Sequence, residues 1–214
     1  KRRDMNRGLF ITIEGIDGSG KSTHAAMLAD YLAGKDIPVK LTREPGGTPI
    51  GEQVRNILLD KANRNMMPMT EALLYAASRA QHVAEVIRPS IEAGYVVICD
   101  RFIDSSLAYQ GYARGLGIDT IARINEYALD GMWPDITLFL DITPEIAMNR
   151  IEMVGETDRL EAEGIELLKS VYEGYKILAR LYPKRFNIID ASRELLDVQK
   201  SILAVIEPKL ISIV

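Results

Sequence analysis

The stretch that decides the fold of this 214-residue chain is Gly15-Ile16-Asp17-Gly18-Ser19-Gly20-Lys21-Ser22-Thr23. It fits the phosphate-binding loop pattern G-x-x-x-x-G-K-[ST] without a gap. The apolar run 9–13 precedes it and predicts a strand, and the run 25–29 follows it and predicts a helix. Because the pattern requires that strand and that helix, their presence argues against a simple glycine-rich turn.

The residue types of this loop match the chemistry of a bound phosphate chain. Glycines let the backbone curl so that successive N–H groups point at one anion, and the following helix adds the positive end of its dipole. Lys21 is expected to reach the β- and γ-phosphates, and Ser22 to ligate Mg²⁺. We therefore predict that residues 15–23 bind a nucleoside triphosphate. A nucleotide-driven switch or motor would carry the same loop, so the rest of the chain has to identify the reaction.

The composition limits the classes of protein to which the chain can belong. Apolar residues make up 47% of the sequence, yet no apolar run reaches the length of a membrane span. The net charge of −4 argues against a surface for duplex nucleic acid, which needs clustered Lys and Arg. The lone Cys99 cannot form an internal disulfide and fits a reducing compartment, so we predict a cytoplasmic protein.

The order of segments predicts one domain over residues 1–214, with residues 1–4 before Met5 as a possible N-terminal extension. Strand and helix patterns alternate, which predicts an α/β fold: a five-stranded parallel sheet between two layers of helices. The expected strands, short and apolar as strands buried on both faces should be, are 9–14, 39–42, 96–100, 136–140 and 186–189. The expected helices are 21–33, 49–60, 69–92, 118–130, 143–152, 162–181 and 192–207.

Two charged pairs follow strands and should meet the phosphate loop at one edge of the sheet. Arg43-Glu44 comes after the second strand, and either contacts a polar ligand or forms a solvated ion pair in a tight turn. Asp100-Arg101 ends the third strand. A carboxylate at that position helps to hold Mg²⁺, and the guanidinium beside it can bridge phosphates. We favour function over a surface pair here, because the loop that needs such a pair is present.

Three further segments carry polar side chains whose role the residues alone leave open. On helix 69–92, Tyr75 and Arg79 lie one turn apart and either read a nucleobase or sit at the core margin and in solvent. The segment 104–111 either reads a sugar or base edge or begins an ordinary capped helix. The segment 149–161, with charges around a single glycine, predicts either a mobile lid or a solvated helix–loop–helix.

Taken together, these motifs resemble the thymidylate kinase family, phosphate-loop enzymes that phosphorylate dTMP. The resemblance runs from residue 9 to about 190 and rests on segments 15–23, 42–51, 73–82, 100–111 and 155–161. Thr42-Arg43-Glu44-Pro45-Gly46-Gly47, followed by Asp-Arg and Ala-Tyr-Gln, is its most specific part. It implies the P-loop NTPase fold and direct, in-line transfer of the γ-phosphoryl group from Mg²⁺·ATP to dTMP, within the synthesis of dTTP.

The resemblance also implies roles for individual residues. The acceptor site is expected to contain Glu44, Arg55, Tyr75, Arg79, Arg101, Ser105, Ser106, Tyr109 and Gln110. Within it, Tyr75 would stack on thymine, Arg79 would bond its O4, and Tyr109 would fill the space of a ribose 2′-hydroxyl. Asp17 would face the deoxyribose 3′-hydroxyl and the acceptor phosphate, close to Arg101.

The family stabilises the transferring phosphoryl group with an arginine either in the loop or in the lid. This loop has none, so the lid at about 149–161 should supply it, with Arg150 and Arg159 as the candidates. Glu152 and Val154 stand where bacterial lids commonly carry more arginines. A homodimer through helices 49–60 and 69–92 is expected from the family. The rival readings are a kinase for another monophosphate or a deoxynucleoside, and a nucleotide-dependent switch.

Overall fold

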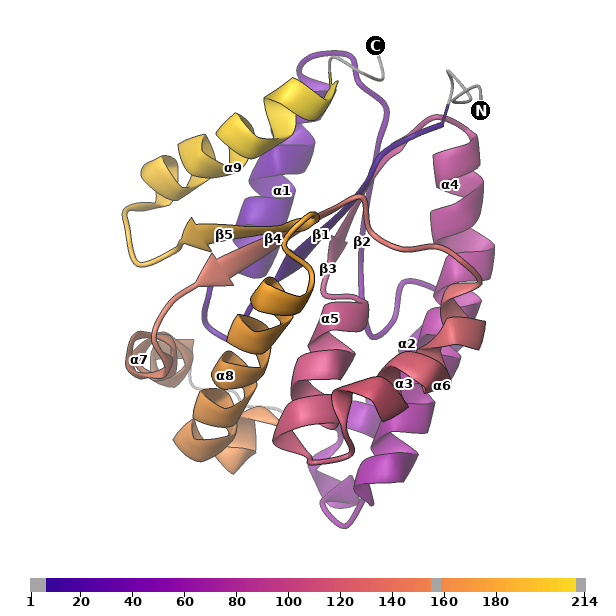
Figure 1. Cartoon of the computed structure of the whole chain (residues 1–214), viewed down its shortest axis with the longest axis vertical. Coiled ribbons are helices and arrows are strands. Elements are labelled where there is room, and N and C mark those ends of the chain that lie inside the picture. Colours follow the sequence, from indigo (N-terminus) through magenta and orange to yellow (C-terminus); the bar gives the residue numbers. More distant parts are fainter. Residues whose placement is uncertain (1–6, 155–158, 211–214) are drawn as a thin grey trace.

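The computed structural model describes residues 7–154 and 159–210. The possible extension at 1–4 and the centre of the expected lid, 155–158, lie outside these residues. Five parallel strands form one sheet in the order β2-β3-β1-β4-β5 (Figure 1). The strands are β1 Phe10–Glu14, β2 Val39–Arg43, β3 Val96–Asp100, β4 Ile136–Asp141 and β5 Phe186–Asp190. This confirms the predicted α/β fold and all five predicted strands to within one residue at either end.

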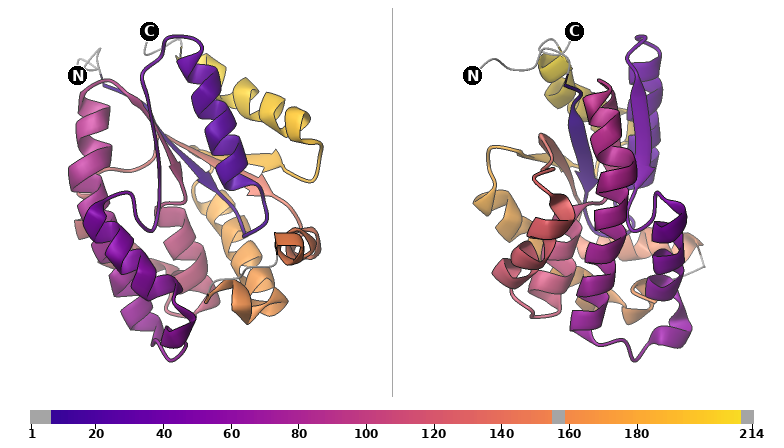
Figure 2. Two further views of the ribbon diagram at one scale, coloured as in Figure 1. Left: turned by 180° about the vertical axis from the view of Figure 1, so that it is seen from behind. Right: turned by 90° about the vertical axis from the view of Figure 1, so that its right-hand side faces the viewer.

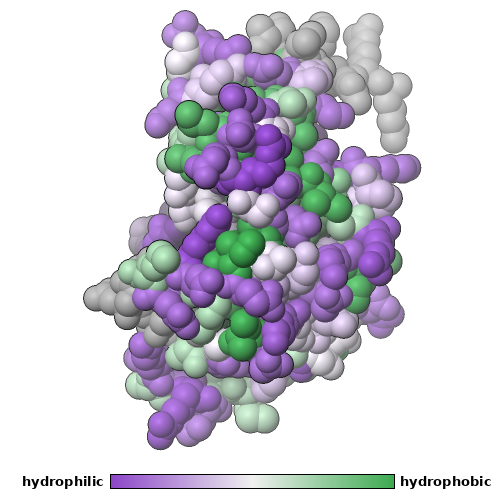
Figure 3. Space-filling model, turned by 90° about the vertical axis from the view of Figure 1, so that its left-hand side faces the viewer, coloured by the Kyte–Doolittle hydropathy of each residue, from purple (hydrophilic) through white to green (hydrophobic). Residues whose placement is uncertain are grey.

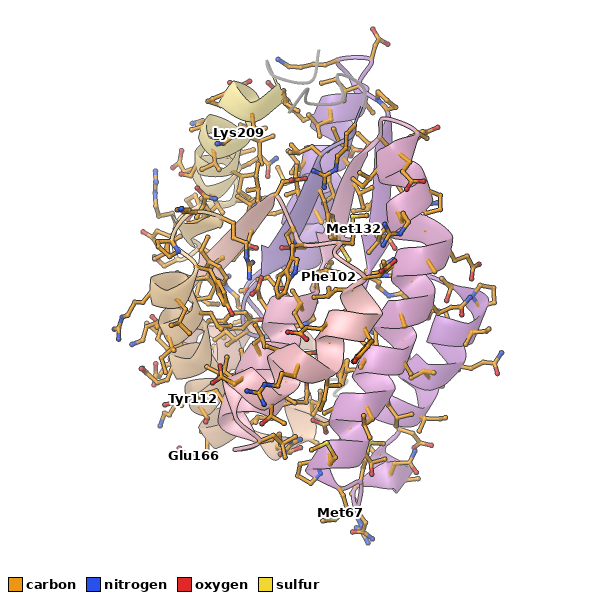
Figure 4. All side chains as sticks on the ribbon, turned by 45° about the vertical axis from the view of Figure 1, so that its right-hand side comes forward. Met67, Phe102, Tyr112, Met132, Glu166 and Lys209 are labelled. Atoms are coloured by element: carbon orange, nitrogen blue, oxygen red, sulfur yellow. The ribbon has the colours of Figure 1, made fainter. Side chains whose placement is uncertain are left out.

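Helices cover both faces of the sheet, with α1 and α9 on one face and α5 and α8 on the other (Figures 1 and 2). The α-helices are α1 Lys21–Ala33, α2 Pro49–Leu59, α3 Pro68–His82, α4 Arg88–Glu92, α5 Ile103–Ser106, α6 Ile118–Leu129, α7 Pro144–Val154, α8 Ile165–Leu181 and α9 Leu195–Leu210. Shorter helical segments are η1 Lys61–Asn63, η2 Val83–Ile87, η3 Leu107–Ala113 and η4 Glu161–Glu163. Helices α2 and α3 extend beyond the sheet, and Met67 marks their tip (Figure 4).

The core lies on both sides of the central strands. Every residue of β1 is buried, and Phe10 packs edge-on against Phe102 with ring centroids 4.9 Å apart. We expected every strand to be buried on both faces. Strand β2 is not, because it lies at the edge of the sheet, and none of its residues is fully buried. On the face seen in Figure 3, hydrophobic residues form small separate areas within a mainly hydrophilic surface. None of the described helices is both long enough and apolar enough to cross a lipid bilayer.

The predicted helix 69–92 is found as one continuous helical run, α3-η2-α4, from Pro68 to Glu92. Its η2 part is π-helical: Arg88 N–H bonds Val83 O, and Pro89 follows and has no N–H to restore regular bonding. Of the two readings of segment 104–111, the helix start is found: residues 103–113 are helical without a side-chain cap, and most of them (η3) are π-helical. Helix α9 begins at Leu195 rather than at 192, because the Ser192 hydroxyl bonds Asp190 instead of capping the helix.

Candidate active site

A cavity of about 490 Å³ opens where the carboxyl ends of β1, β2 and β3 meet. Its walls come from the phosphate loop, the turn after β2, helices α2 and α3, the segment 100–110 and the ends of the expected lid. The lining residues are Asp17, Gly18, Gly20, Lys21, Ser22, Thr23, Arg43, Glu44, Pro45, Arg55, Leu59, Tyr75, Asp100, Arg101, Ser105, Ser106, Tyr109, Gln110, Arg150, Ile151 and Leu160. The cavity thus combines a phosphate loop with a second polar wall.

The loop has the backbone shape that an anion cradle requires. Gly18 and Gly20 have φ values of +78° and +89°, which L side chains rarely adopt. A Cβ on Gly18 would lie 2.5 Å from the carbonyl oxygen of Ala147. The buried Oγ of Ser19 has no hydrogen-bond partner within the described part of the chain. Of the remaining loop residues, Gly15 and Ile16 form the start of the turn behind the cavity. A loop of this shape fits a phosphate chain.

Lys21 is held inside the loop by two neighbouring residues. Its Nζ donates to Ile16 O at 2.8 Å and lies 3.9 Å from a carboxylate oxygen of Asp17. Burial, helped by the nearby positive charge of Arg101, lowers the pKa of Lys21 to about 8. Burial alone would raise the pKa of Asp17, but the charges of Arg101 and Lys21 outweigh it and lower that pKa to about 2. The loop therefore carries a lysine whose charge is sensitive to its ligand.

The predicted metal ligands, Ser22 and Asp100, lie side by side. Ser22 Oγ donates to Asp100 Oδ2 at 2.5 Å, which joins the start of α1 to the end of β3. A hydroxyl and a carboxylate are hard oxygen ligands of the kind that Mg²⁺ takes alongside phosphate oxygens and water. No group of three or more His, Cys, Asp or Glu residues within 7–154 and 159–210 could hold a metal by itself. The donor set therefore fits Mg²⁺ bound together with phosphate groups.

Arg101 is clamped between the loop and the second wall. Its φ of +66° is rare for a side-chain-bearing residue, and its N–H bonds Ile13 O at 3.0 Å. The guanidinium donates to Gly15 O at 3.0 Å and forms an ion pair with Asp17. Tyr109 donates its hydroxyl to the other oxygen of Asp17 at 2.8 Å. These bonds fix the guanidinium at the junction between the phosphate loop and the second wall.

A buried carboxylate that sequence reasoning missed supports this junction. Glu14 is fully buried and accepts hydrogen bonds from Phe102 N, Ser105 Oγ and Tyr175 Oη at 2.8, 2.6 and 2.8 Å. Burial and the neighbouring carboxylate of Asp104 raise the pKa of Glu14 to about 7. An acidic residue at the last position of a buried strand was the signal that could have revealed it.

Arg79 lies behind the cavity rather than in its lining. It is 1% exposed, and its guanidinium contacts Glu44 at 2.8 Å, Ser106 Oγ at 3.1 Å, and Asn125. Its Nε has no hydrogen-bond partner among the residues described here. His82 lies on the other side of Glu44, with its Nδ1 3.0 Å from Oε1 of that carboxylate. Arg79 thus positions Glu44 and Ser106, which do face the cavity.

The remaining predicted residues of the acceptor site all line the cavity. Ser105 and Ser106 lie on α5, Tyr109 and Gln110 on η3, Tyr75 on α3 and Arg55 on α2. Arg55 donates to Pro45 O at 2.9 Å.

The two lid arginines have different environments. Arg150 lines the cavity and donates weakly to Gly18 O at 3.3 Å and to Ala191 O at 3.4 Å. Arg159 does not line it. Its side chain is buried, donating to Leu58 O at 2.7 Å and to Glu71 at 2.5 Å.

Comparison with known proteins gives a consistent result. A family model described as "Thymidylate kinase" matches residues 13–202. The chain is 51% identical over 199 residues to the thymidylate kinase of Symbiobacterium thermophilum, covering 93% of this chain and 92% of that protein. It is 53% identical over 191 residues to that of Clostridium novyi, covering 88% and 93%. The crystal structure of thymidylate kinase from Ehrlichia chaffeensis superposes with a TM-score of 0.77 at 34% identity, covering 94% of this chain and 99% of that one.

Proposed function

This chain belongs to the thymidylate kinase family, and we propose that its cavity transfers the γ-phosphoryl group of ATP directly to dTMP, giving ADP and dTDP. The observation that carries this proposal is the single cavity lined by both the phosphate loop and a second polar wall. A nucleotide-dependent switch needs the loop but has no use for that second wall. A cytoplasmic site of action and one domain closed by a lid belong to the same proposal.

The donor side of the reaction is assigned to the loop. Its backbone N–H groups and Lys21 hold the β- and γ-phosphates, because they offer positive charge from fixed positions. Ser22 and Asp100 hold Mg²⁺, which, when bound, neutralises charge on the phosphate oxygens. Arg101 neutralises the acceptor phosphate, and its clamp by Asp17 and Gly15 fixes where that phosphate can lie.

The acceptor needs positioning more than deprotonation. A phosphate monoester has its second pKa near about 6, so the attacking oxygen of dTMP is already largely ionised at neutral pH. This agrees with a cavity in which the lining residues include no histidine. Catalysis is therefore assigned to in-line alignment and charge neutralisation.

The second wall is assigned to dTMP. Tyr75 offers a ring for stacking on the base, and Arg55 lies at the phosphate end with Glu44. Ser105, Ser106 and Gln110 supply polar contacts. Tyr109, fixed by Asp17, occupies the place of a ribose 2′-hydroxyl. Arg79 acts on thymine O4 only if its buried guanidinium turns toward the cavity, and otherwise through Ser106.

Of the two lid arginines, we assign the transferring phosphoryl group to Arg150. It lines the cavity beside the loop, and its bonds to Gly18 O and Ala191 O are long ones to carbonyl oxygens that a phosphate can replace. Arg159 has short bonds to Leu58 O and to the Glu71 carboxylate, which hold it away from the cavity.

A homodimer through α2 and α3 is part of the proposal. These helices pack together and expose Ile50, Ile57, Met69 and Leu73 on the surface. Neighbouring apolar side chains of this kind favour a protein partner. Light scattering on the wild type and on a Leu73→Glu variant tests the dimer; equal masses for both, at the value of a monomer, contradict it.

The activity is tested by measuring ADP formation from Mg²⁺·ATP with dTMP, dUMP, AMP, CMP, UMP, GMP and thymidine supplied in turn. We expect strong turnover with dTMP, weaker turnover with dUMP and background rates with the others. Faster turnover with thymidine or with another monophosphate would show that this compound, and not dTMP, is the acceptor. ATP binding without turnover on any acceptor would favour the switch.

A further inference from the structure

Glu71 is a buried charge in the first turn of α3 to which the proposed reaction assigns no role. Its side chain is 1% exposed. Oε1 accepts a hydrogen bond from Gln110 Nε2 at 2.9 Å, and Oε2 accepts one from Arg159 Nη2 at 2.5 Å. Arg114 donates to both oxygens, at 3.3 and 3.2 Å. The carboxylate therefore accepts from two separate segments of the chain: η3 with its C-cap residue Arg114, and the residue Arg159 after the expected lid.

Two of these donors belong to, or adjoin, the wall of the cavity. Gln110 lines the cavity directly. Arg159 precedes Leu160, which also lines it. Arg159 is bonded twice to the end of α2, from its Nε to Leu58 O at 2.7 Å and from its backbone N to Leu59 O at 3.2 Å. Glu71 thus connects the residues after the expected lid with the polar wall of the acceptor side.

Arg114 extends the connection toward α8. Its two terminal nitrogens donate to the two oxygens of Glu163 at 2.6 and 2.5 Å, the forked geometry that suits a carboxylate. Two glutamates and two arginines then balance in charge. Burial would raise the pKa of Glu71, but the bonds from Gln110 and the arginines outweigh it and lower that pKa below its usual value. Glu71 is therefore a carboxylate, and can only accept hydrogen bonds, at neutral pH.

This has a consequence for Gln110. Because an ionised carboxylate accepts and never donates, the Gln110 side chain must turn its NH₂ group toward Glu71. That leaves Gln110 Oε1, an acceptor, for the cavity that Gln110 lines. A ligand with an N–H group, such as the N3–H of thymine, suits that acceptor. Cytosine has a lone pair in place of that N–H and does not.

We propose that Glu71 is a positioning residue for both ends of the acceptor side: it holds Arg159 and Leu160 against α2 and α3, and it fixes the amide of Gln110 with its oxygen toward the cavity. The effects of Glu71 on KM and kcat rest on the proposed function, whereas its effect on the position of Arg159 does not. Glu71 touches no reacting atom in this scheme. It acts through Gln110 and Arg159.

The test uses the full-length Glu71→Gln variant, which keeps the size of the side chain but removes the charge and the acceptor-only restriction. Glu166→Gln is the matched control, since Glu166 lies on α8 with its side chain 83% exposed, in a surface pair with Lys169. For Glu71→Gln we expect about a tenfold higher KM for dTMP, a tenfold lower kcat and a smaller preference for dTMP over dCMP. The Kd for ADP should stay within twofold of wild type. The control should match wild type.

Arg159→Gln separates the two arms of the proposal and stands in if Glu71→Gln does not fold. It should lower kcat while leaving KM for dTMP and the dTMP:dCMP preference near wild type. The double variant should be no worse in kcat than either single variant, because both remove the same bond. Unchanged kcat, KM and preference in a Glu71→Gln variant that merely melts earlier would mean a structural role only and would overturn the proposal.

A second readout does not depend on the reaction. Arg159 is 6% exposed and held by Glu71, so trypsin should cut the bond after it slowly in the wild type. We expect at least tenfold faster cleavage there in Glu71→Gln than in Glu166→Gln, each well below its melting temperature. Equal cleavage rates in the two variants would contradict the proposal that Glu71 holds Arg159 in place. Absent turnover in the wild type would instead count against the proposed function and leave this readout valid.

Discussion

The two walls of the cavity are built in opposite ways. The donor wall is nine consecutive residues whose backbone forms the cradle, and only Lys21 and Ser22 are assigned a ligand through their side chains. The acceptor wall is made of side chains from the turn after β2, from α2 and α3, and from the segment 100–110. Several of them are held by a second side chain, as Glu44 is by Arg79 and Gln110 is by Glu71. A backbone cradle should be sensitive to glycine substitutions, whereas a side-chain wall should be sensitive to its buried partners.

The largest effect is expected from Gly18→Ala in the donor wall. The new Cβ would meet Ala147 O at 2.5 Å, so the cradle must shift by a large part of an ångström. Misplacement of that size costs roughly 100-fold in kcat/KM. Gly115→Ala is the matched control, with a similar φ of +73° and nothing within 4 Å of its Cβ. Steady-state kinetics and melting curves on both variants should show a loss of stability in each but a loss of turnover only in Gly18→Ala.

Arg79→Lys is expected to have the next largest effect, on the acceptor wall alone. Lysine keeps the charge but lacks the fork that reaches Glu44, Ser106 and Asn125 together. KM for dTMP should rise about 10–30-fold, while the Kd for ADP stays constant, because lysine keeps part of the bonding and loses only the lower part of the roughly 1.5–3 kcal/mol that a bond to a charged group contributes. Arg88→Lys, in a more exposed pair with Asp130, is the control. If Arg79→Lys weakened the binding of ADP as much as that of dTMP, the division into a donor wall and an acceptor wall would be contradicted.

The pH dependence of ATP binding should report the protonation of Lys21, which belongs to the donor wall alone. The pKa of Lys21 is about 8 in the free protein, so the lysine is protonated and ready for phosphate below pH 8 and neutral above it. Binding at higher pH then requires proton uptake, and affinity should fall by up to about tenfold between pH 8 and 9.

Titration calorimetry at pH 9 in two buffers of different ionisation enthalpy measures this uptake. The binding heat should depend on the buffer at pH 9, and the lysine should contribute no such dependence at pH 7. Identical heats in both buffers at pH 9 would show that Lys21 keeps its proton in the free protein.

Tyr109→Phe should have the smallest effect, since its hydroxyl makes only one short hydrogen bond, the 2.8 Å bond to Asp17, and otherwise accepts a long one from Arg101 at 3.4 Å. A single bond of this kind contributes about 1 kcal/mol, which corresponds to roughly a fivefold lower kcat/KM for dTMP. The ring remains, so discrimination against ribose monophosphates should persist, whereas Tyr109→Ala should relax it. The control is Tyr112→Phe, at a side chain that is 39% exposed (Figure 4). Relaxed sugar selectivity in Tyr109→Phe would contradict the steric argument.

The sequence predicted the sheet well because buried parallel strands are short apolar runs that end in turns. It predicted the helix 69–92 to within one residue, but not the π-helical bonding of η2 and η3, which departs from the 3.6-residue pattern on which helix prediction depends. For the polar segment 104–111 it left open a helix start or a ligand-reading segment, because nothing local shows that Asp104 is buried against Arg185.

The same limit applies within the site. The pattern at 15–23 carries its own backbone geometry, so its position and ligand class could be predicted from adjacent residues. Arg79 and Arg159 were chosen as ligand contacts by their resemblance to a family pattern. Whether a guanidinium faces a cavity or a buried glutamate depends on which segment folds against it. Glu44 is 35 residues from Arg79 in the sequence, and Glu71 is 88 residues from Arg159.

The fold class, the phosphate loop and the edge of the sheet where the polar segments meet could be predicted from the sequence alone, because these follow from local geometry and from strand direction. Which buried charge meets which partner follows only from the tertiary structure. It placed Glu14 against Ser105 and Tyr175, Arg79 behind Glu44 and Arg159 against Glu71. A buried charge takes the partner that the packed chain brings to it, and that partner comes from a distant segment whose contact no local pattern records.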